Sequence, residues 1–409
     1  MRFIYLDNNA STQVHPEVAQ AMREWTEGSL SYGNPHAGHF LGERSRIAIA
    51  NARSQVCSIF GIYEGWRCIF TSGATESINF ALKGTMFRLL KARWNQSSAI
   101  VYVLTSPVEH SAVDKCLEWL VDLFGPGSVH IEKMHVDSHG VIDTVKLKET
   151  LSKRQEGFDL VTCIHTVAET GAVQPIEEIS HMVKSKFPSV IFHCDASQSV
   201  GKLRNELVRS LARSCDLITV AGHKFHAPKG VGALLIKSCV DIDPLIHGAG
   251  QEYGLRGGTE NVAYIVGLGK ACEIAQKEGI PTSPEAIQKS WDKFEAHLAA
   301  AGINFRLNST APERSPFTIN FSIDGFHGPN LVKGLGNRGQ ENICVCFSAG
   351  SACHSRGGPS PSKVLQAMGV EPRYSVSGIR LSLGKLSTEA ELDEGLHALA
   401  SYIVNSLER

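Results

Sequence analysis

Short apolar segments alternate with amphipathic segments along the middle of the chain, from about Arg67 to Lys237. The apolar segments have the length of strands, and in the amphipathic segments apolar residues recur every three or four positions, as they do in helices. This alternation predicts a mainly parallel, doubly wound α/β sheet with helices on both of its faces. We expect strands at residues 68–70, 100–104, 160–164, 190–193, 217–220 and 231–236, and helices at 75–92, 111–124 and 176–186.

The pattern changes after the Gly-Gly-Thr sequence at residues 257–259. We expect helices at 261–277 and 283–301, a loop at 312–316, a strand at 317–323 and a helix at 330–335. Strands at 343–347 and 379–383 and a helix from Thr388 follow. A chain of 409 residues is long enough for two or three domains, and this part is expected to form a smaller α+β domain.

Charge and hydropathy exclude two classes of partner. The chain has 40 Lys and Arg against 41 Asp and Glu, a formal net charge of −1, so no basic field favours nucleic acid. No run approaches the roughly 18 apolar residues that a membrane-spanning helix needs. We therefore expect neither a nucleic-acid partner nor a membrane partner.

The 11 cysteines follow no disulfide or zinc pattern. Those at positions 57, 68, 116, 163, 194, 215, 239 and 272 have apolar neighbours and are expected to be buried. Cys344, Cys346 and Cys353 are clustered, but their spacing differs from the paired CxxC motifs of zinc sites, so no metal site is expected. The first residues lack the pattern of a signal peptide, which favours a reducing, cytoplasmic location.

A segment rich in small residues, 70–77, ends one predicted strand and begins a predicted helix. Backbone N–H groups and the hydroxyl of Thr75 could bind a phosphate at the positive end of the helix dipole. The same residues also suit an ordinary helix N-cap, with Glu76 in the first turn. The segment alone therefore leaves both interpretations open.

Three other side chains follow predicted strands. Asp195 could face the crevice at the carboxyl end of the sheet or cap a helix. Lys224 could be a surface charge or an amine that forms a Schiff base. His110 could stack on a ring or be structural. Together with a phosphate-binding helix start, an aspartate for a pyridinium nitrogen and a lysine for an aldehyde are what pyridoxal phosphate requires, so we expect this cofactor.

Eight motifs occur in an order typical of one family: GNP at 33–35, TSGATES at 71–77, VEH at 108–110, ETG at 169–171, DASQ at 195–198, GHKF at 222–225, GTEN at 258–261 and SAGSAC at 348–353. On these motifs the chain resembles the class V aminotransferase family, in its cysteine desulfurase and selenocysteine lyase branch. The resemblance implies fold type I of the pyridoxal-phosphate enzymes, with a seven-stranded sheet and a homodimer. It also implies an N-terminal segment (1–14) that packs with the small domain, a large cofactor-binding domain (15–262) and a small domain (263–409).

The resemblance also implies roles for individual residues. The catalytic residues would be Lys224, Cys353 and His110. Lys224 would form the Schiff base and move the proton of the substrate Cα, and Cys353 would attack the substrate sulfur or selenium. The thiolate of Cys353 would be favoured by a nearby cation, with His354 and Arg356 as candidates. Asn34 and Arg380 would bind the substrate, Arg380 through its α-carboxylate. The cofactor would be bound by Ala74, Thr75, His110 (stacked on the ring), Asp195 (at the pyridinium nitrogen), Gln198 (at the phenolic oxygen), His223, Lys224 and Thr259 (reaching the phosphate across a dimer interface).

The chain departs from the family's pattern at two places. Val167 and Ala168 stand where the family usually has two asparagines, the second of which supports the phenolic oxygen of the cofactor. Ala221 replaces a serine that usually binds the phosphate and that selenocysteine lyases also lack. The segment that starts at Cys353 is one residue longer than in iron–sulfur desulfurases, and its Cys-His-Ser start looks like selenocysteine lyase.

The expected reaction is the removal of selenium or sulfur from L-selenocysteine or L-cysteine to give L-alanine, with a protein as the acceptor of the selenium or sulfur. Two alternatives stay open. An enzyme of the same fold could act on another amino acid, which the Val167–Ala168 departure would permit. A non-catalytic sulfur-assembly scaffold is the other alternative. The residues that argue against it are Lys224, Asp195, Arg380 and Cys353.

Overall fold

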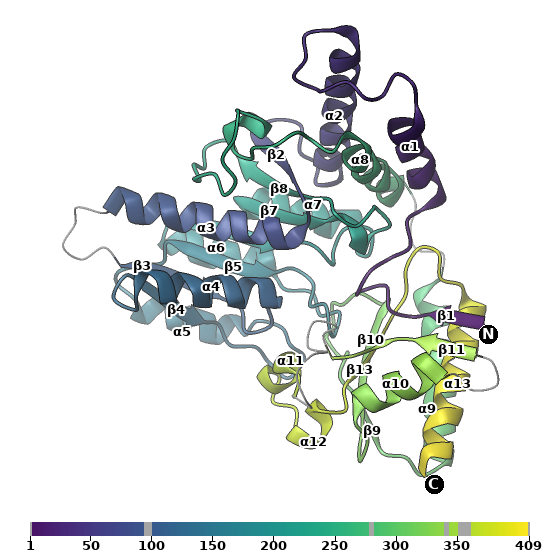
Figure 1. The fold of residues 1–409 in the computed structure, drawn as a ribbon. Helices are drawn as coiled ribbons and strands as arrows, with labels where there is room; N and C mark the ends of the chain where they lie inside the picture. The colour runs from purple at the N-terminus through teal and green to yellow at the C-terminus, as the bar shows by residue number, and fades with distance from the viewer. Residues whose placement is uncertain (1, 94–99, 278–281, 339–342, 351–360, 408–409) are drawn as a thin grey trace.

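A computed structural model describes residues 2–93, 100–277, 282–338, 343–350 and 361–407. The chain forms a larger body around a seven-stranded sheet and a smaller body around a four-stranded sheet (Figure 1). Both termini lie at the smaller body (Figure 1). Cys353, His354 and Arg356 lie outside the described residues.

The seven-stranded sheet has the order β2-β8-β7-β6-β5-β3-β4, and only β8 among these strands runs antiparallel to its neighbours. The prediction of a mainly parallel sheet is confirmed. β4 was not predicted, because it is an edge strand in which charged and apolar residues alternate. The strands are β2 (Trp66–Thr71), β3 (Val101–Thr105), β4 (Val129–Lys133), β5 (Leu160–Ile164), β6 (Ile191–Asp195), β7 (Leu217–Ala221) and β8 (Gly232–Lys237).

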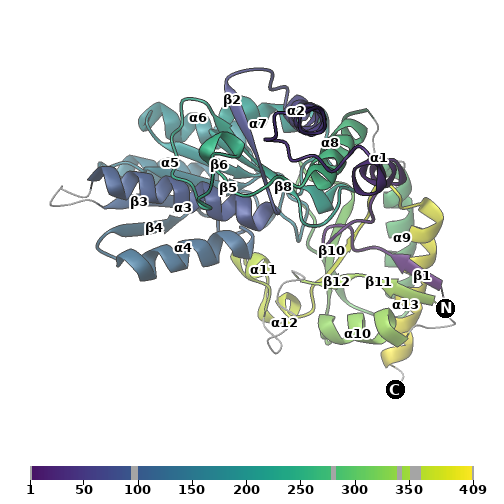
Figure 2. The ribbon, with the colours of Figure 1, turned by 45° about the horizontal axis from the view of Figure 1, so that its top comes forward.

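Helices cover both faces of this sheet, as the sequence predicts. On one face α3 (Ala74–Arg93) and α4 (Ser111–Phe124) bury Leu82 and Val113 against β3. On the other face α5 (Thr144–Lys153), α6 (Ile176–Lys186) and α7 (Asn205–Ser214) join a core that also contains α1 (Pro16–Glu27), α2 (Phe40–Ile59) and α8 (Val262–Lys277). Figure 2 shows α5 and α6 on one side of the strands and α4 on the other.

The smaller body combines an antiparallel sheet, of order β12-β13-β10-β9, with a parallel pair of β1 and β11. Ile4 and Leu6 of the N-terminal segment are buried in its core. Its strands are β1 (Arg2–Tyr5), β9 (Phe305–Leu307), β10 (Thr318–Ile323), β11 (Ile343–Cys346), β12 (Ser348–Ala349) and β13 (Ile379–Ser382). Its helices are α9 (Pro284–Ala300), α10 (Gly328–Arg338), α11 (Lys363–Ala367), α12 (Pro372–Ser375) and α13 (Glu389–Leu407).

The packing of α8 bears on where the two bodies divide. Ile265, Leu268 and Cys272 of this helix are buried in the core of the larger body. The core of the smaller body contains Ile287 of α9, the next helix. We therefore propose a boundary between α8 and α9 in place of the predicted one at 262/263.

Among the described residues, no helix is long and apolar enough to cross a membrane. Six of the eight cysteines expected to be buried are buried. The expectation is wrong for Cys239, which is exposed in the turn after β8, and Cys57 is half-buried.

Candidate cofactor site

A cavity of about 520 Å³ lies where the parallel strands of the large sheet end. β6 ends at Asp195, and β7 leads directly into a short 3₁₀ turn, Gly222–Lys224. Residues of the N-terminal segment and of β13 complete the wall. Eight predicted site residues line this cavity: Ala74, Thr75, His110, Asp195, Gln198, His223, Lys224 and Arg380.

Two predicted site residues do not line the cavity of this single chain. Asn34 is exposed in the loop between α1 and α2, where its side chain accepts a hydrogen bond from the N–H of His36 at 2.9 Å. Thr259 is exposed near the start of α8. Cys353 cannot be placed with respect to the cavity, because it lies outside the described residues.

The side chain of Lys224 points to the N-terminal segment. Its Nζ donates hydrogen bonds to the carbonyl oxygens of Asn9 at 2.7 Å and Ala10 at 3.0 Å. These two residues follow the buried Leu6 and also line the cavity. The amine is therefore held at the cavity by backbone atoms from the other end of the chain.

Asp195 is 2% exposed and makes no ion pair with any described residue. Its Oδ1 accepts a hydrogen bond from the backbone N–H of Ser197 at 2.9 Å and another from the Ser197 hydroxyl. A buried carboxylate without a cation is costly, so this position suits a ligand that brings a positive charge. The protonated ring nitrogen of pyridoxal phosphate has that charge, and the residues present fit this cofactor.

The first turn of α3 forms another part of the wall. Glu76 accepts a hydrogen bond from the N–H of Ser72 at 2.8 Å and pairs with Arg256 at 2.9 Å. Burial alone would raise the pKa of Glu76, but the hydrogen bonds from Arg256 and Ser72 lower it. Arg256 thus balances the one carboxylate of the turn, which leaves the positive helix end available to an anion.

His223 and His110 are both held by hydrogen bonds. Burial and the charge of Lys224 lower the pKa of His223 to about 4, so this ring is neutral at pH 7. Its Nδ1 lies 3.2 Å from the hydroxyl oxygen of Ser11. His110 caps α4, and its Nδ1 accepts a hydrogen bond from the N–H of Ala112 at 3.1 Å, so Nε2 is the ring nitrogen that carries a proton. Of the two rings, the neutral His223 brings no positive charge to the cavity at pH 7.

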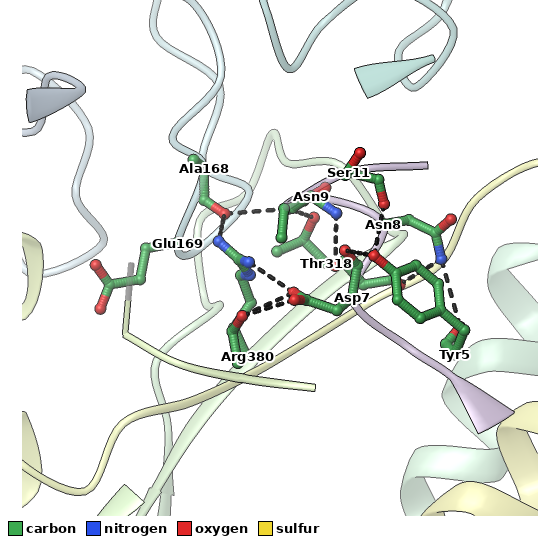
Figure 3. A network of polar contacts seen from close by, with 12 residues as sticks. Tyr5, Asp7, Asn8, Asn9, Ser11, Ala168, Glu169, Thr318 and Arg380 are labelled. Atoms are coloured by element: carbon green, nitrogen blue, oxygen red, sulfur yellow. Dashed lines mark hydrogen bonds and ion pairs between the residues drawn. The ribbon is translucent and has the colours of Figure 1, made fainter. Parts of the chain in front are cut away.

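Arg380 is 2% exposed and lies between two acceptors (Figure 3). Its Nη2 is 2.7 Å from Oδ1 of Asp7, and its Nη1 donates to the carbonyl oxygen of Ala168 at 3.3 Å. The hydroxyl of Ser348, in β12, donates to both oxygens of Asp7 at 2.9 and 2.8 Å. Asp7 thus connects the arginine to β12.

A second cavity, of about 100 Å³, adjoins the first and shares His110, Ile164 and Ala168 with it. Glu169 lines it, and burial raises the pKa of this carboxyl. Oε1 of Glu169 is buried without a hydrogen-bond partner among the described residues.

Several residues of the site were not singled out from the sequence. Asn9, Ser11 and Lys229 line the cavity, and Lys202 lies directly behind it. The sequence does contain a pattern that could have pointed to Asn9 and Ser11, because small polar residues follow a buried apolar segment there, as they do after β6. The contacts of Asn9 with Lys224 and of Ser11 with His223 depend on long-range packing that no local pattern reveals.

A doubly wound sheet with a lysine, a buried aspartate and a helix start around one cavity defines a pyridoxal-phosphate-dependent enzyme. The family described as Aminotransferase class-V matches residues 4–394, and the chain belongs to this family. Its members depend on pyridoxal phosphate, and so does this protein.

The chain is similar to several known proteins. It is 36% identical to a cysteine desulfurase of Nostoc sp. over 98% of this chain and 93% of the relative. It is 35% identical to a mitosomal cysteine desulfurase of Trachipleistophora hominis over 96% of this chain and 84% of the relative. The solved structure of a NifS-like protein, 32% identical, superposes with a TM-score of 0.81 over 98% of this chain and 99% of that one.

Proposed function

We propose that this protein removes sulfur from L-cysteine, and selenium from L-selenocysteine, to give L-alanine. The observation that carries the proposal is the cavity that combines Lys224, Asp195 and Arg380. The similarity to cysteine desulfurases along almost the whole chain supports the same reaction. The sequence pattern that starts at Cys353 supports selenocysteine as the second substrate.

Each residue of the cavity has a task that its chemistry permits. Bound pyridoxal phosphate supplies the electron sink that makes the Cα proton of the substrate acidic. Lys224 would hold the cofactor through its Nζ, and this amine, once the substrate's amino group has displaced it, would move the Cα proton. Asp195 would keep the ring nitrogen protonated, and Gln198 would donate to the phenolic oxygen. His110 would stack on the ring of the cofactor. The phosphate would be bound by Ala74, Thr75 and the neutral His223.

The substrate is held by its carboxylate and attacked at its sulfur. Nε of Arg380 is buried without a partner among the described residues, so the guanidinium retains a donor for the carboxylate. Asn34 is a second proposed substrate contact. Cys353 is the proposed nucleophile, and it takes the sulfur or selenium that is then passed to an acceptor protein.

The functional unit is a homodimer located in the cytoplasm. Asn34 and Thr259 are exposed, and neither lines the cavity of its own chain. Apolar side chains are exposed beside Asn34, with Tyr32 76% and Phe40 70% exposed. A second copy that covers this surface would bring Asn34 and Thr259 to a cavity.

Alanine release from L-cysteine and from L-selenocysteine tests the proposal. Wild type should release alanine from both, Lys224→Ala from neither, and Cys353→Ala should lose roughly 100-fold or more in rate. Cys239→Ala, which removes an exposed cysteine outside the cavity, is the matched control and should equal wild type. Wild type that binds the cofactor but releases alanine from neither substrate would refute the proposal and favour another amino-acid substrate.

A further inference from the structure

Lys202 is a buried lysine that the proposed reaction does not use. It is 5% exposed, and no carboxylate of the described residues forms an ion pair with it. A buried ammonium without a counter-ion is costly, and burial together with the charges of Lys224 and Arg380 lowers the pKa of Lys202 well below its usual value. A group with this cost and no structural ion pair calls for an explanation.

The hydrogen bonds of Lys202 lead to the wall of the cofactor cavity. Nζ donates to Oε1 of Gln198 at 2.5 Å and to Oδ1 of Asn9 at 2.8 Å, with a longer contact of 3.5 Å to the carbonyl oxygen of Asn8. Gln198 and Asn9 both line the cavity. A neutral amine still has two N–H groups, so both short bonds are available whether or not the lysine is charged.

The local backbone explains why Lys202 reaches Gln198. After β6 the chain turns tightly, with hydrogen bonds from the N–H of Ser199 to the carbonyl of Ala196 at 2.9 Å and from Lys202 to Ser199 at 3.2 Å. Gly201 has a φ of +72°, a backbone conformation that residues with a side chain rarely adopt. A Cβ added at this position would lie 3.2 Å from Cβ of Phe225. This turn places the two side chains, four residues apart, next to each other.

The donors and acceptors leave Gln198 a single orientation. Charged or neutral, Nζ of Lys202 uses its N–H groups on Oε1 of Gln198 and Oδ1 of Asn9, so the amide oxygen of Gln198 faces Nζ. The amide nitrogen then faces the carbonyl oxygen of Asn9, to which it donates at 2.9 Å. One of its two N–H groups makes that bond, and the other is available to an acceptor in the cavity.

We infer that Lys202 is a positioning residue that locks the side-chain amide of Gln198 in the orientation in which its second N–H faces the cofactor. The inference rests on the proposed role of Gln198 as the donor to the phenolic oxygen. It matters more in this chain than in one with the family's usual asparagine, because Ala168 has no side-chain donor. A flipped Gln198 amide would present an oxygen to the phenolic oxygen, and two acceptors repel.

A double-mutant cycle tests the inference. The dissociation constant of pyridoxal phosphate is measured on apoprotein by tryptophan fluorescence for wild type, Lys202→Met, Gln198→Leu and the double variant. We expect each single variant to weaken binding about tenfold, and the double variant to bind as weakly as Gln198→Leu alone, because Lys202 acts through Gln198. Lys184→Met, which removes a partly buried lysine paired with Asp216, is the matched control and should bind as wild type does.

Each result decides one question. If Lys202→Met weakens binding by the same factor in the wild-type and the Gln198→Leu backgrounds, or does not weaken it, the inference is wrong. If Lys202→Met does not fold, Lys202→Gln, which keeps an amide donor, takes its place in the same cycle. Wild type that fails to bind pyridoxal phosphate at all would instead refute the proposed function.

Discussion

At the scale of single residues, the cavity is characterised by buried charges that lack complete compensation. Asp195 and Arg380 are each 2% exposed; Asp195 makes no ion pair with a described residue, and Nε of Arg380 has no hydrogen-bond partner among the described residues. Such residues lower the stability of the empty protein and gain partners when a charged ligand binds. Stability and ligand binding are therefore expected to change in opposite directions at Asp195.

Asp195→Asn tests this opposition. The variant keeps an oxygen that can accept from Ser197 but removes the unpaired buried charge, so the apoprotein should be at least as stable as wild type. The loss of a charged hydrogen bond, about 1.5–3 kcal/mol, should weaken binding of pyridoxal phosphate about 10- to 100-fold. Thermal melts of the apo and cofactor-loaded protein measure both effects. An apoprotein that is strongly destabilised, with unchanged cofactor affinity, would contradict the expectation.

The ion pair of Asp7 and Arg380 should behave in the opposite way. Asp7→Ala leaves a buried guanidinium without its counter-ion and should cost about 3 kcal/mol of unfolding free energy, measured with urea. Glu313→Ala removes a carboxylate from an exposed pair with Arg204, joined at 3.2 Å, and should cost less than about 1 kcal/mol. Equal costs for the two variants would show that burial of Arg380 does not govern the strength of the pair.

At the scale of elements, six of the seven strands of the large sheet and the helices α3, α4, α6 and α8 were predicted to within a few residues, whereas β4, α5 and α7 were not predicted. The predicted and observed bounds agree for β5, α4 and α6. Parallel strands that are buried on both faces appear in the sequence as apolar runs, and in helices apolar residues recur every three or four positions. The short strands β1, β9 and β12 were not predicted. β1 and β12 owe their existence to the more distant strands β11 and β13, and β9 has only 3 residues, too few to show a pattern.

The same distinction holds for the site. Residues at strand ends, such as Asp195 and Lys224, could be predicted because the carboxyl ends of parallel strands converge. Asn9, Asp7 and Lys202 could not, because their positions depend on how the N-terminal segment packs against both bodies. Local sequence patterns do not encode that packing.

His193 joins three adjacent strands and makes the sheet sensitive to acid. Its Nδ1 lies 2.8 Å from the Thr162 hydroxyl on β5, and its Nε2 lies 2.9 Å from the Thr219 hydroxyl on β7. Burial lowers the pKa of His193 to about 4. Between about pH 6.5 and pH 4 the unfolded chain binds a proton that the folded chain does not, so stability falls as pH decreases through this range.

His193→Gln should remove one proton from that dependence. In urea unfolding at several pH values, the variant's slope between about pH 6.5 and pH 4 should be smaller by about 1.4 kcal/mol per pH unit. The variant is also expected to be less stable at pH 7, because glutamine does not match both hydroxyls. His130→Gln, on the exposed side of β4, is the control and should keep the wild-type slope. An unchanged slope in His193→Gln would mean that His193 titrates alike in both states.

At the scale of the whole molecule, the site requires both bodies. Lys224 and Asp195 come from the larger body, whereas Arg380 lies on β13 of the smaller one. The N-terminal segment reaches both, because Asp7 pairs with Arg380 and the Asn9 carbonyl accepts from Lys224. Relative movement of the bodies would therefore change the distance between the groups proposed to hold the cofactor and the substrate.

The proposed dimer extends this requirement to a second chain. Phe40 and Ile47 are seven residues apart on α2 and so share one helix face, with 70% and 51% of their surfaces exposed. Phe40→Glu places a charge on this face and should shift the mass measured by light scattering from two chains to one. Leu123→Glu changes a similarly exposed residue on α4, 53% exposed, and should leave the mass unchanged.

Cofactor affinity links the dimer to the site. If Thr259 of a second copy contacts the phosphate, monomeric Phe40→Glu and dimeric Thr259→Ala should both bind pyridoxal phosphate more weakly, each by about tenfold or more. The two changes should not add when combined, because a monomer has already lost the contact. A Phe40→Glu monomer with wild-type affinity would show that one chain holds the complete cofactor site, and Thr259 would then have no role in it.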